Sequence, residues 1–221
     1  MNRRLLILRP EPGASATAAR AAAMGMKAIV RPLFETHAVE WSAPDAAMFD
    51  SVLMTSANAA LHGGSGLAKY LNLPLYAVGD ATAEAAKRVG FRNIISGNDD
   101  VTTIIGKMAE DQRNHALHLA GRDRTAFEST SFGVETVTVY VSEIVSAPAI
   151  PDDVVALVHS ARAARRFAAV TMQKSSIALI AISSAAANAA GSGWQSVEIA
   201  GQPQDAAMLA LAARLCEMRE E

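Results

Sequence analysis

The chain repeats itself at a fixed spacing, and this repeat constrains the fold more than any other feature of the sequence. Residues 51–60 read SVLMTSANAA, and residues 155–164 read VALVHSARAA. Further along, residues 78–83 (VGDATA) correspond to residues 182–187 (ISSAAA), and both pairs are offset by 104 residues. Each copy combines an apolar strand, a small polar turn and an Ala-rich helix. A repeat of this size predicts two similar lobes, with a cleft in which a ligand can bind.

Short apolar runs alternate with Ala-rich helical patterns along the whole chain. This alternation is typical of parallel sheets that are covered on both faces. We expect strands at 5–8, 28–30, 51–54, 75–78, 93–95, 116–119, 134–140, 154–158, 177–181 and 197–199. We expect helices at 13–24, 58–70, 82–89, 101–113, 162–172 and 204–218. The sequence therefore predicts an α/β protein with two flavodoxin-like or Rossmann-like lobes, each built on a parallel five-stranded sheet.

The repeat also predicts how the strands divide between the lobes. The first copy supplies five strands through residue 140, whereas the second opens near residue 154 and supplies three. The two missing strands can come from the N-terminal segment. We therefore expect lobe one to comprise 1–37 plus 143–221 and lobe two to comprise 38–140, with linkers near 36–44 and 139–147. Two crossings of this kind form a hinge.

The composition narrows the function classes. The 221 residues are 51% apolar and carry a formal net charge of −2, which is ordinary for a soluble globular protein and argues against a nucleic-acid-binding one. The single cysteine, Cys216, excludes an internal disulfide and suits a reducing cytoplasm. The first apolar run stops at Arg9, too early for a signal peptide, and no run reaches the roughly 18 residues of a membrane span. We expect a cytoplasmic location.

Small polar residues follow the strands at the positions where parallel sheets bind ligands, beyond the carboxyl ends of the strands. Turns of this type present hydroxyls and unpaired helix N–H groups, which suit a ligand rich in carboxylates or phosphates. An alternative remains that these hydroxyl side chains only cap their own helices. The candidate binding residues are Arg9, Thr55, Ser56, Asn58, Gly79, Thr82, Gly121, Arg122, Ser160 and Ser183.

The sequence lacks the complete motifs of common cofactor-binding sites. Residues 64–66 (GSG) lack the third glycine of a dinucleotide fingerprint and follow a helix rather than a strand. The five histidines show no metal-binding spacing, so we expect no metal site. Neither a phosphate-binding loop nor a GxSxG motif is present.

Several motifs, taken together, resemble the uroporphyrinogen-III synthase family. They are LRPEPG (8–13), MTSANA (54–59), YAVGDATA (76–83), LAGR (119–122), VTVY (137–140) and AGQP (200–203). They occur in the family's order and cover nearly the whole chain. The family fold is two α/β lobes joined by a two-stranded linker, which agrees with the division expected from the repeat.

The resemblance implies a lyase that works without a cofactor. Its substrate would be hydroxymethylbilane, a linear tetrapyrrole with eight carboxylates. The enzyme closes this chain into uroporphyrinogen III with loss of water and inversion of the last pyrrole ring, in heme biosynthesis. A rival interpretation is a non-catalytic two-lobed protein that binds an anionic metabolite. We expect a monomer, and a transient contact with the preceding enzyme of the pathway stays open.

The resemblance also implies roles for individual residues. Tyr140 matches the family's linker tyrosine and is the candidate donor to the departing hydroxyl; the alternative is that it only packs the linker. Thr82 matches the threonine at the lobe-two helix start that faces the cleft. Ser56 and Ser160 match the paired serines after the first strand of each copy, and Arg9 and Arg122 would bind substrate carboxylates. Ala186 departs from the pattern, because family members often carry a hydroxyl residue at the lobe-one position equivalent to Thr82.

Overall fold

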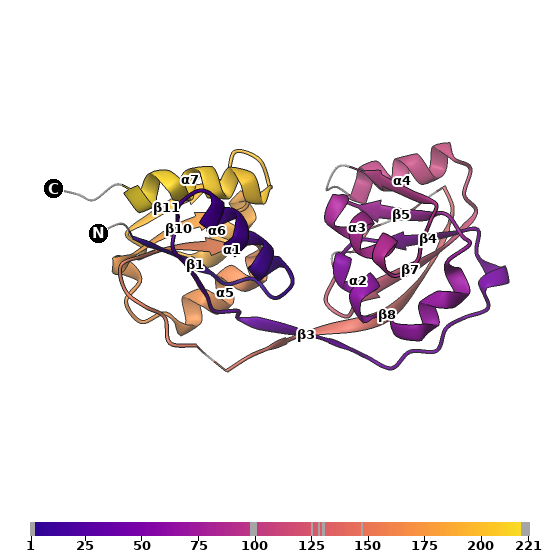
Figure 1. Cartoon of the computed structure of the whole chain (residues 1–221), viewed down its shortest axis with the longest axis horizontal. Helices are drawn as coiled ribbons and strands as arrows, with labels where there is room; N and C mark the ends of the chain where they lie inside the picture. The colour runs from indigo at the N-terminus through magenta and orange to yellow at the C-terminus, as the bar shows by residue number, and fades with distance from the viewer. Residues whose placement is uncertain are drawn as a thin grey trace. The chain divides into compact units, whose positions relative to one another are not determined.

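The computed structural model describes residues 3–97, 101–124, 126–127, 129, 131–146 and 148–217. The chain forms two compact units (Figure 1), which we call unit one (Met1–Glu35 with Ile144–Glu221) and unit two (Thr36–Glu143). The backbone leaves unit one within β3 (Phe34–Ala38) and returns at the end of β8 (Gly133–Ile144). Residue 147, at the end of the second predicted linker, lies outside the described residues.

Unit one contains the predicted five-stranded parallel sheet, in the order β11-β10-β9-β1-β2. Its strands are β1 (Arg4–Ile7), β2 (Ala28–Val30), β9 (Val154–Val158), β10 (Ile177–Ala181) and β11 (Ser196–Ile199). Successive residues of a strand face opposite sides of the sheet. Leu5 and Ile7 therefore pack with helices α1 (Gly13–Ala23) and α7 (Asp205–Glu217), whereas Leu6 packs with α5 (Ala161–Val170) and α6 (Ser184–Ala190). Both faces of this sheet are buried.

Unit two contains a sheet in the order β3-β8-β7-β4-β5-β6, and its strands run parallel from β8 to β6. The remaining strands are β4 (Ser51–Met54), β5 (Leu75–Val78), β6 (Ile94–Gly97) and β7 (His115–Gly121). Val52 and Met54 pack with α2 (Ala57–His62) and α3 (Asp80–Arg88) on one face, whereas Leu53 packs with α4 (Val101–Glu110) on the other. Short 3-10 helices are η1 (Ala46–Met48), η2 (Gly64–Tyr70) and, in unit one, η3 (Lys174–Ser176).

The prediction of five strands is wrong for this second sheet, which has six. The extra strand, β3, reads FETHA and buries only Phe34, so it lacks the apolar pattern that marks a strand in a sequence. The backbone N–H of Val39 donates to Val139 O at 3.2 Å, and that of Val145 donates to Leu33 O at 3.2 Å. Because these pairs run in opposite directions, β3 lies antiparallel to β8.

The predicted helix over 58–70 is also corrected. The α-helix ends at His62, and the chain continues as the 3-10 helix η2. Gly64 has a φ of +63°, in the left-handed region that favours glycine. A left-handed residue cannot continue an α-helix, so the chain turns here.

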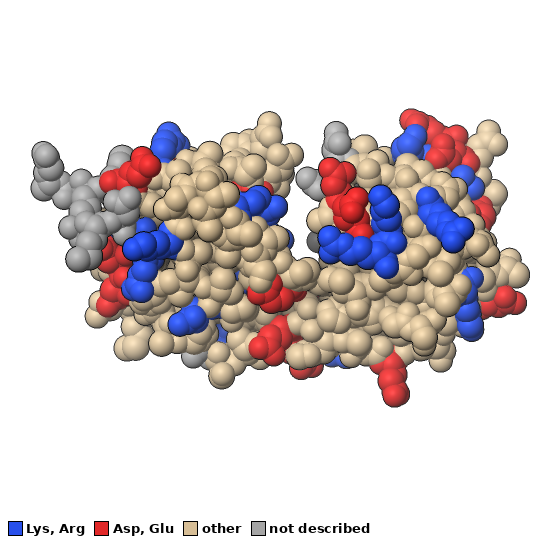
Figure 2. Space-filling view, in the orientation of Figure 1, with Lys and Arg blue, Asp and Glu red and all other residues tan. Residues whose placement is uncertain are grey.

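The surface fits a near-neutral protein. Acidic and basic side chains are interspersed over the visible face of each unit (Figure 2), in keeping with the formal net charge of −2. Within the described part of the chain, no helix is both long enough and apolar enough to cross a bilayer.

Candidate active site

The turn after β4 carries three of the predicted binding residues. Ser56 has extended backbone, and its hydroxyl accepts a hydrogen bond from the N–H of Asn58 at 3.3 Å, which caps α2. The side-chain oxygen of Asn58 is buried and has no hydrogen-bond partner in the described structure. An unpaired buried acceptor costs about 1–3 kcal/mol, so this oxygen is a position for a hydrogen-bond donor from a ligand or water.

The turn after β5 depends on a glycine. Gly79 has a φ of +78°, and its carbonyl accepts hydrogen bonds from the N–H groups of Thr82 (3.1 Å) and Ala83 (3.2 Å). This turn therefore satisfies donors at the start of α3 through backbone rather than through a side chain. Thr82, the predicted substrate-facing threonine, is only 3% exposed.

Tyr140 is placed by an irregularity of the sheet. Along β7 and β8, Ala120 pairs with Thr138 but Gly121 pairs with Tyr140, so the register shifts by one residue. A β-bulge of this kind redirects the side chains that follow it. The ring of Tyr140 lies over Gly121, where an added Cβ would be 2.6 Å from Cζ and 2.9 Å from the hydroxyl oxygen. Gly121 is thus the residue that gives the tyrosine ring its space.

Neighbouring side chains complete the surroundings of Tyr140. The ring of His62 lies 6.1 Å from the tyrosine ring, and its Nε2 is 3.0 Å from Oγ1 of Thr36. Burial, with a smaller effect of His37, lowers the pKa of His62. The backbone carbonyl of Tyr140 accepts the N–H of Arg122 at 3.0 Å, and the Arg122 side chain is exposed.

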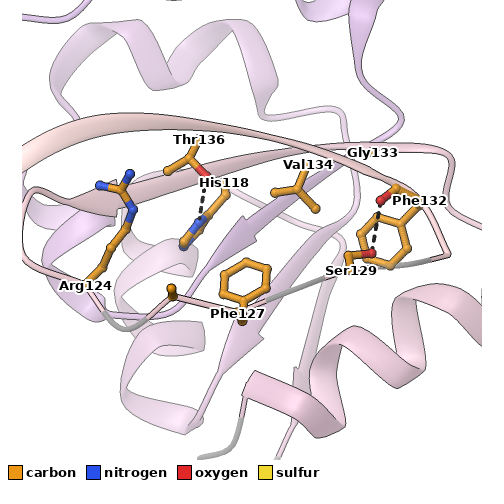
Figure 3. Close-up of a pocket in the computed structure, with 9 residues that line it drawn as sticks. His118, Arg124, Phe127, Ser129, Phe132, Gly133, Val134 and Thr136 are labelled. Atoms are coloured by element: carbon orange, nitrogen blue, oxygen red, sulfur yellow. Dashed lines mark hydrogen bonds between the residues drawn. The ribbon is translucent and has the colours of Figure 1, made fainter.

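Thr55 takes part in a polar group around the buried His118 that the sequence did not reveal. Its hydroxyl lies 3.2 Å from Nε2 of His118, and Nδ1 of the same ring lies 3.4 Å from Oγ1 of Thr136 (Figure 3). His118 is 1% exposed, and burial, with a smaller effect of Arg124, lowers its pKa to about 4. The imidazole is therefore neutral at pH 7 and donates through one nitrogen while it accepts through the other.

In unit one, the strand ends carry two serine caps. The hydroxyl of Ser160 accepts the N–H of Ala163 at 3.1 Å, and that of Ser183 accepts the N–H of Ala186 at 3.3 Å. Both serines have extended backbone, as Ser56 does. Ala186 is fully buried in the core, so its methyl group fills space. Each cap hydroxyl still carries one O–H that it can donate to a ligand.

The strongest polar cluster of unit one surrounds Asp205, a residue that the sequence analysis missed. Its carboxylate accepts hydrogen bonds from Thr17 Oγ1 (2.9 Å) and from Arg20 at 2.6 and 3.0 Å, and it lies 2.8 Å from His159 Nε2. Arg9 Nη1 lies 3.5 Å away. Asp205 thus ties the residues that follow β1 and β9 to the start of α7.

Burial and hydrogen bonding shift the pKa values of the titratable groups in this cluster. Burial alone would raise the pKa of the Asp205 carboxyl, but its hydrogen bonds, the strongest from His159, hold the pKa well below its ordinary value. Burial lowers the pKa of His159, and Asp205 counteracts this only in part. A neutral His159 that donates from Nε2 leaves Nδ1 as an acceptor, and this buried atom has no hydrogen-bond partner among the described residues. Burial also lowers the pKa of Arg9.

The predicted residues thus form two groups, one in each unit. Thr55, Ser56, Asn58, Gly79, Thr82, Gly121, Arg122 and Tyr140 belong to unit two, and Arg9, Ser160 and Ser183 belong to unit one. Among the residues that the structure describes, no cluster of three or more His, Cys, Asp or Glu side chains could hold a metal ion. The predicted residues of the two groups can donate hydrogen bonds and supply positive charge.

Comparisons with known proteins identify the family and the fold. A sequence model described as "Uroporphyrinogen-III synthase HemD" matches residues 15–210. No curated protein sequence matches the chain. Among solved structures, uroporphyrinogen-III synthetase from Helicobacter pylori is similar over 96% of this chain and 99% of its own, with a TM-score of 0.68 and 17% identity. A mutant uroporphyrinogen III synthase from Thermus thermophilus is similar over 96% and 98%, with a TM-score of 0.51 and 13% identity. At these identities the structural matches show the fold.

Proposed function

The chain belongs to the uroporphyrinogen-III synthase family, and from this premise we propose that Tyr140 assists ring closure of hydroxymethylbilane. Enzymes of the family are cyclising lyases of heme biosynthesis. In the proposed step, the phenolic O–H donates to the terminal hydroxyl as its C–O bond breaks and water leaves. The resulting carbocation bonds to the substituted α-carbon of the last pyrrole ring and gives a spiro intermediate. The bond from that carbon to the neighbouring methylene then breaks and re-forms at the unsubstituted α-carbon of the ring, which inverts the ring, and the proton lost from this carbon returns to the phenolate.

One observation carries this assignment, the placement of Tyr140. The register shift after Ala120 and the missing side chain at Gly121 together leave room for its ring, which also lies 6.1 Å from the ring of His62. Bulges of this kind occur next to active sites, where they re-aim a side chain.

The remaining candidates supply binding rather than bond making. The hydroxyls of Ser56, Ser160 and Ser183 each accept a helix N–H and keep one O–H for a substrate carboxylate. Arg9 and Arg122 add positive charge. A contact at a helix start is worth about 0.3–1 kcal/mol, so a substrate with many carboxylates needs several of them. We therefore infer that these groups mainly control the conformation of the substrate, which decides whether the last ring inverts.

The test compares two tyrosines of unit two. Tyr140→Phe is expected to lower kcat about 10²–10⁴-fold, the usual contribution of a positioned acid, and to raise the share of uroporphyrinogen I, which forms without catalysis. Tyr70→Phe is the control, because within the described part of the chain the Tyr70 hydroxyl binds only the carbonyl of Pro44. Fresh hydroxymethylbilane is supplied, and the porphyrin isomers are separated after oxidation. If the Tyr140→Phe enzyme kept the wild-type rate and isomer ratio, Tyr140 would only pack the linker.

We also infer that the protein acts as a cytoplasmic monomer. The only cysteine, Cys216, is buried, and burial raises the pKa of its thiol to about 11, which suits a stable reduced thiol. Light scattering after size-exclusion chromatography should give a mass near 23.2 kDa at all concentrations. A mass that doubles with concentration would contradict the inference.

A further inference from the structure

His62 connects three elements of unit two at the place where Tyr140 lies. It is the last residue of α2, and its Nε2 lies 3.0 Å from Oγ1 of Thr36 on β3. Its ring also lies 6.1 Å from the ring of Tyr140 on β8, with 33° between the two planes. Aromatic rings at such separations attract one another beyond the area that they bury. Because β3 and β8 are neighbouring strands, the imidazole joins α2 to both of them.

The backbone around His62 is held by the segment that follows β3. The indole N–H of Trp41 donates to the carbonyl of Gly63 at 3.0 Å, and Gly63 itself is buried. The indole ring packs against Gly66, where an added Cβ would be 2.7 Å from Cζ2. These contacts fix the end of α2, so the fold sets the position of the His62 imidazole.

The imidazole of His62 is neutral at pH 7. Burial, and to a smaller extent His37, lowers its pKa below the ordinary value of 6.5. A neutral ring in the last turn of a helix gains little from the helix dipole, which favours positive charge there. His62 also lines a pocket of about 580 Å³ with residues 38–42 and 63–66, so it is not a residue of the closed apolar core. Its specific contacts among the described residues are those with Thr36 and Tyr140.

We propose that His62 is a positioning residue for Tyr140, which holds the tyrosine ring in the direction that its phenolic O–H needs to reach the departing hydroxyl. The bulge sets the main chain of Tyr140, and Gly121 leaves room for the ring. Neither of them stops the ring from turning about its side-chain bonds. The neighbouring imidazole, itself bonded to Thr36, limits that motion. The catalytic part of this inference rests on the proposed function, whereas the contact of the two rings does not.

NMR of the full chain measures the orientation of the ring without reference to activity. The Tyr140 ring lies over Gly121, so its ring current displaces the α-proton signals of Gly121 from their position in a Tyr140→Leu protein. His62→Ala should move these signals towards the Tyr140→Leu position, because the tyrosine ring is then free to turn. Gly121 signals that are identical in the wild-type and His62→Ala proteins would overturn the inference, whether or not Tyr140 is catalytic.

His115→Ala is the matched control. The ring of His115 also packs against an aromatic ring of unit two, that of Phe49 at 5.0 Å, and its Nδ1 lies 2.8 Å from the carbonyl oxygen of Met48. His115 begins β7 and Gly121 ends it, so the two residues lie about 20 Å apart at 3.3 Å per residue. The control should leave both the Gly121 signals and kcat unchanged.

Steady-state kinetics with fresh hydroxymethylbilane then test the catalytic part. His62→Ala should lower kcat about 10–100-fold at nearly constant KM, since a small displacement of a catalytic group is costly. His62→Phe keeps a ring beside Tyr140 and should restore most of kcat. In the Tyr140→Phe background, His62→Ala should have no further effect, because His62 acts through the phenolic O–H. An equal loss of kcat in both backgrounds would overturn the positioning role.

The same variants separate this inference from the proposed function. Wild-type kcat in the Tyr140→Phe enzyme would remove the catalytic role of Tyr140 and the positioning role of His62 together. A slow Tyr140→Phe enzyme beside a His62→Ala enzyme with wild-type kcat would remove the positioning role alone.

Discussion

Acid should destabilise unit two through His118. The pKa of this imidazole falls from its ordinary value of 6.5 to about 4 in the folded protein, because the ring is buried and lies near Arg124. The unfolded chain therefore binds a proton at a higher pH than the folded chain does. Stability is unaffected above about pH 6.5 and decreases as the pH falls from there towards 4.

The size of this loss follows from the separation of the two pKa values. One pH unit of separation is worth about 1.4 kcal/mol. The free energy of unfolding should therefore drop by about 2 kcal/mol between pH 7 and pH 5, and by about 3 kcal/mol by pH 4, from this group alone. Typical domains have only about 5–15 kcal/mol of stability, so the effect is large.

Urea denaturation at pH 7, 5 and 4 measures the loss. The chain has two tryptophans, Trp41 in unit two and Trp194 in unit one, so a Trp194→Phe background makes the fluorescence report unit two. His118→Gln keeps a donor and an acceptor but cannot be protonated. As the pH is lowered, the free energy of unfolding of the His118→Gln protein should fall less than that of the parent. Subtracting the two values at each pH cancels the contribution of all other titrating groups. If the free energy of unfolding fell equally with pH in the two proteins, the reasoning would be refuted.

Three further changes test other contacts. Gly121→Ala places a Cβ 2.6 Å from Cζ of Tyr140, so steady-state kinetics should show kcat reduced about 10²-fold or more, whereas Gly106→Ala, with open space around its Cβ, should leave kcat unchanged. Asp205→Asn should destabilise unit one by about 2–4 kcal/mol at pH 7, since it removes the charge that holds two arginines and a histidine. Because the pKa of Asp205 is depressed, this difference should shrink in urea denaturation as the pH falls below about 4; a constant difference would contradict the charge argument. Ser183→Ala should lower the thermal midpoint by the equivalent of about 1 kcal/mol, the usual effect of a lost helix cap, and an unchanged midpoint would show that the cap bond at Ala186 contributes nothing.

Most of the fold could be predicted because buried parallel strands read as continuous apolar runs. The strands at 51–54, 75–78, 154–158 and 177–181 were predicted with the bounds that the structure shows. The edge strand β3 was missed because only one of its five residues is buried, so local sequence carries almost no signal for it. Pairing with β8, about a hundred residues away, makes it a strand.

The candidate site could be predicted only where its residues act locally. Ser56, Ser160 and Ser183 bond to N–H groups two or three residues along the chain, and sequence patterns record such contacts. Asp205 contacts His159, 46 residues away in the sequence, and Arg9, 196 residues away. No local sequence pattern therefore predicts the role of Asp205. The bulge that seats Tyr140 is likewise a property of two strands together and has no signature in either one.

The repeat and the two sheets together show where the copies have diverged. The β2-β1-β9-β10-β11 order of unit one matches the β8-β7-β4-β5-β6 order of unit two, strand for strand. Thr55 of one copy corresponds to His159 of the other, and each contacts a titratable partner, His118 on β7 or Asp205 on α7. The position that corresponds to His118 in unit one is Ile7, by the pairing with β9. A buried polar group is stable only with its partners, so each pair had to change as a whole while the apolar strands around it stayed alike.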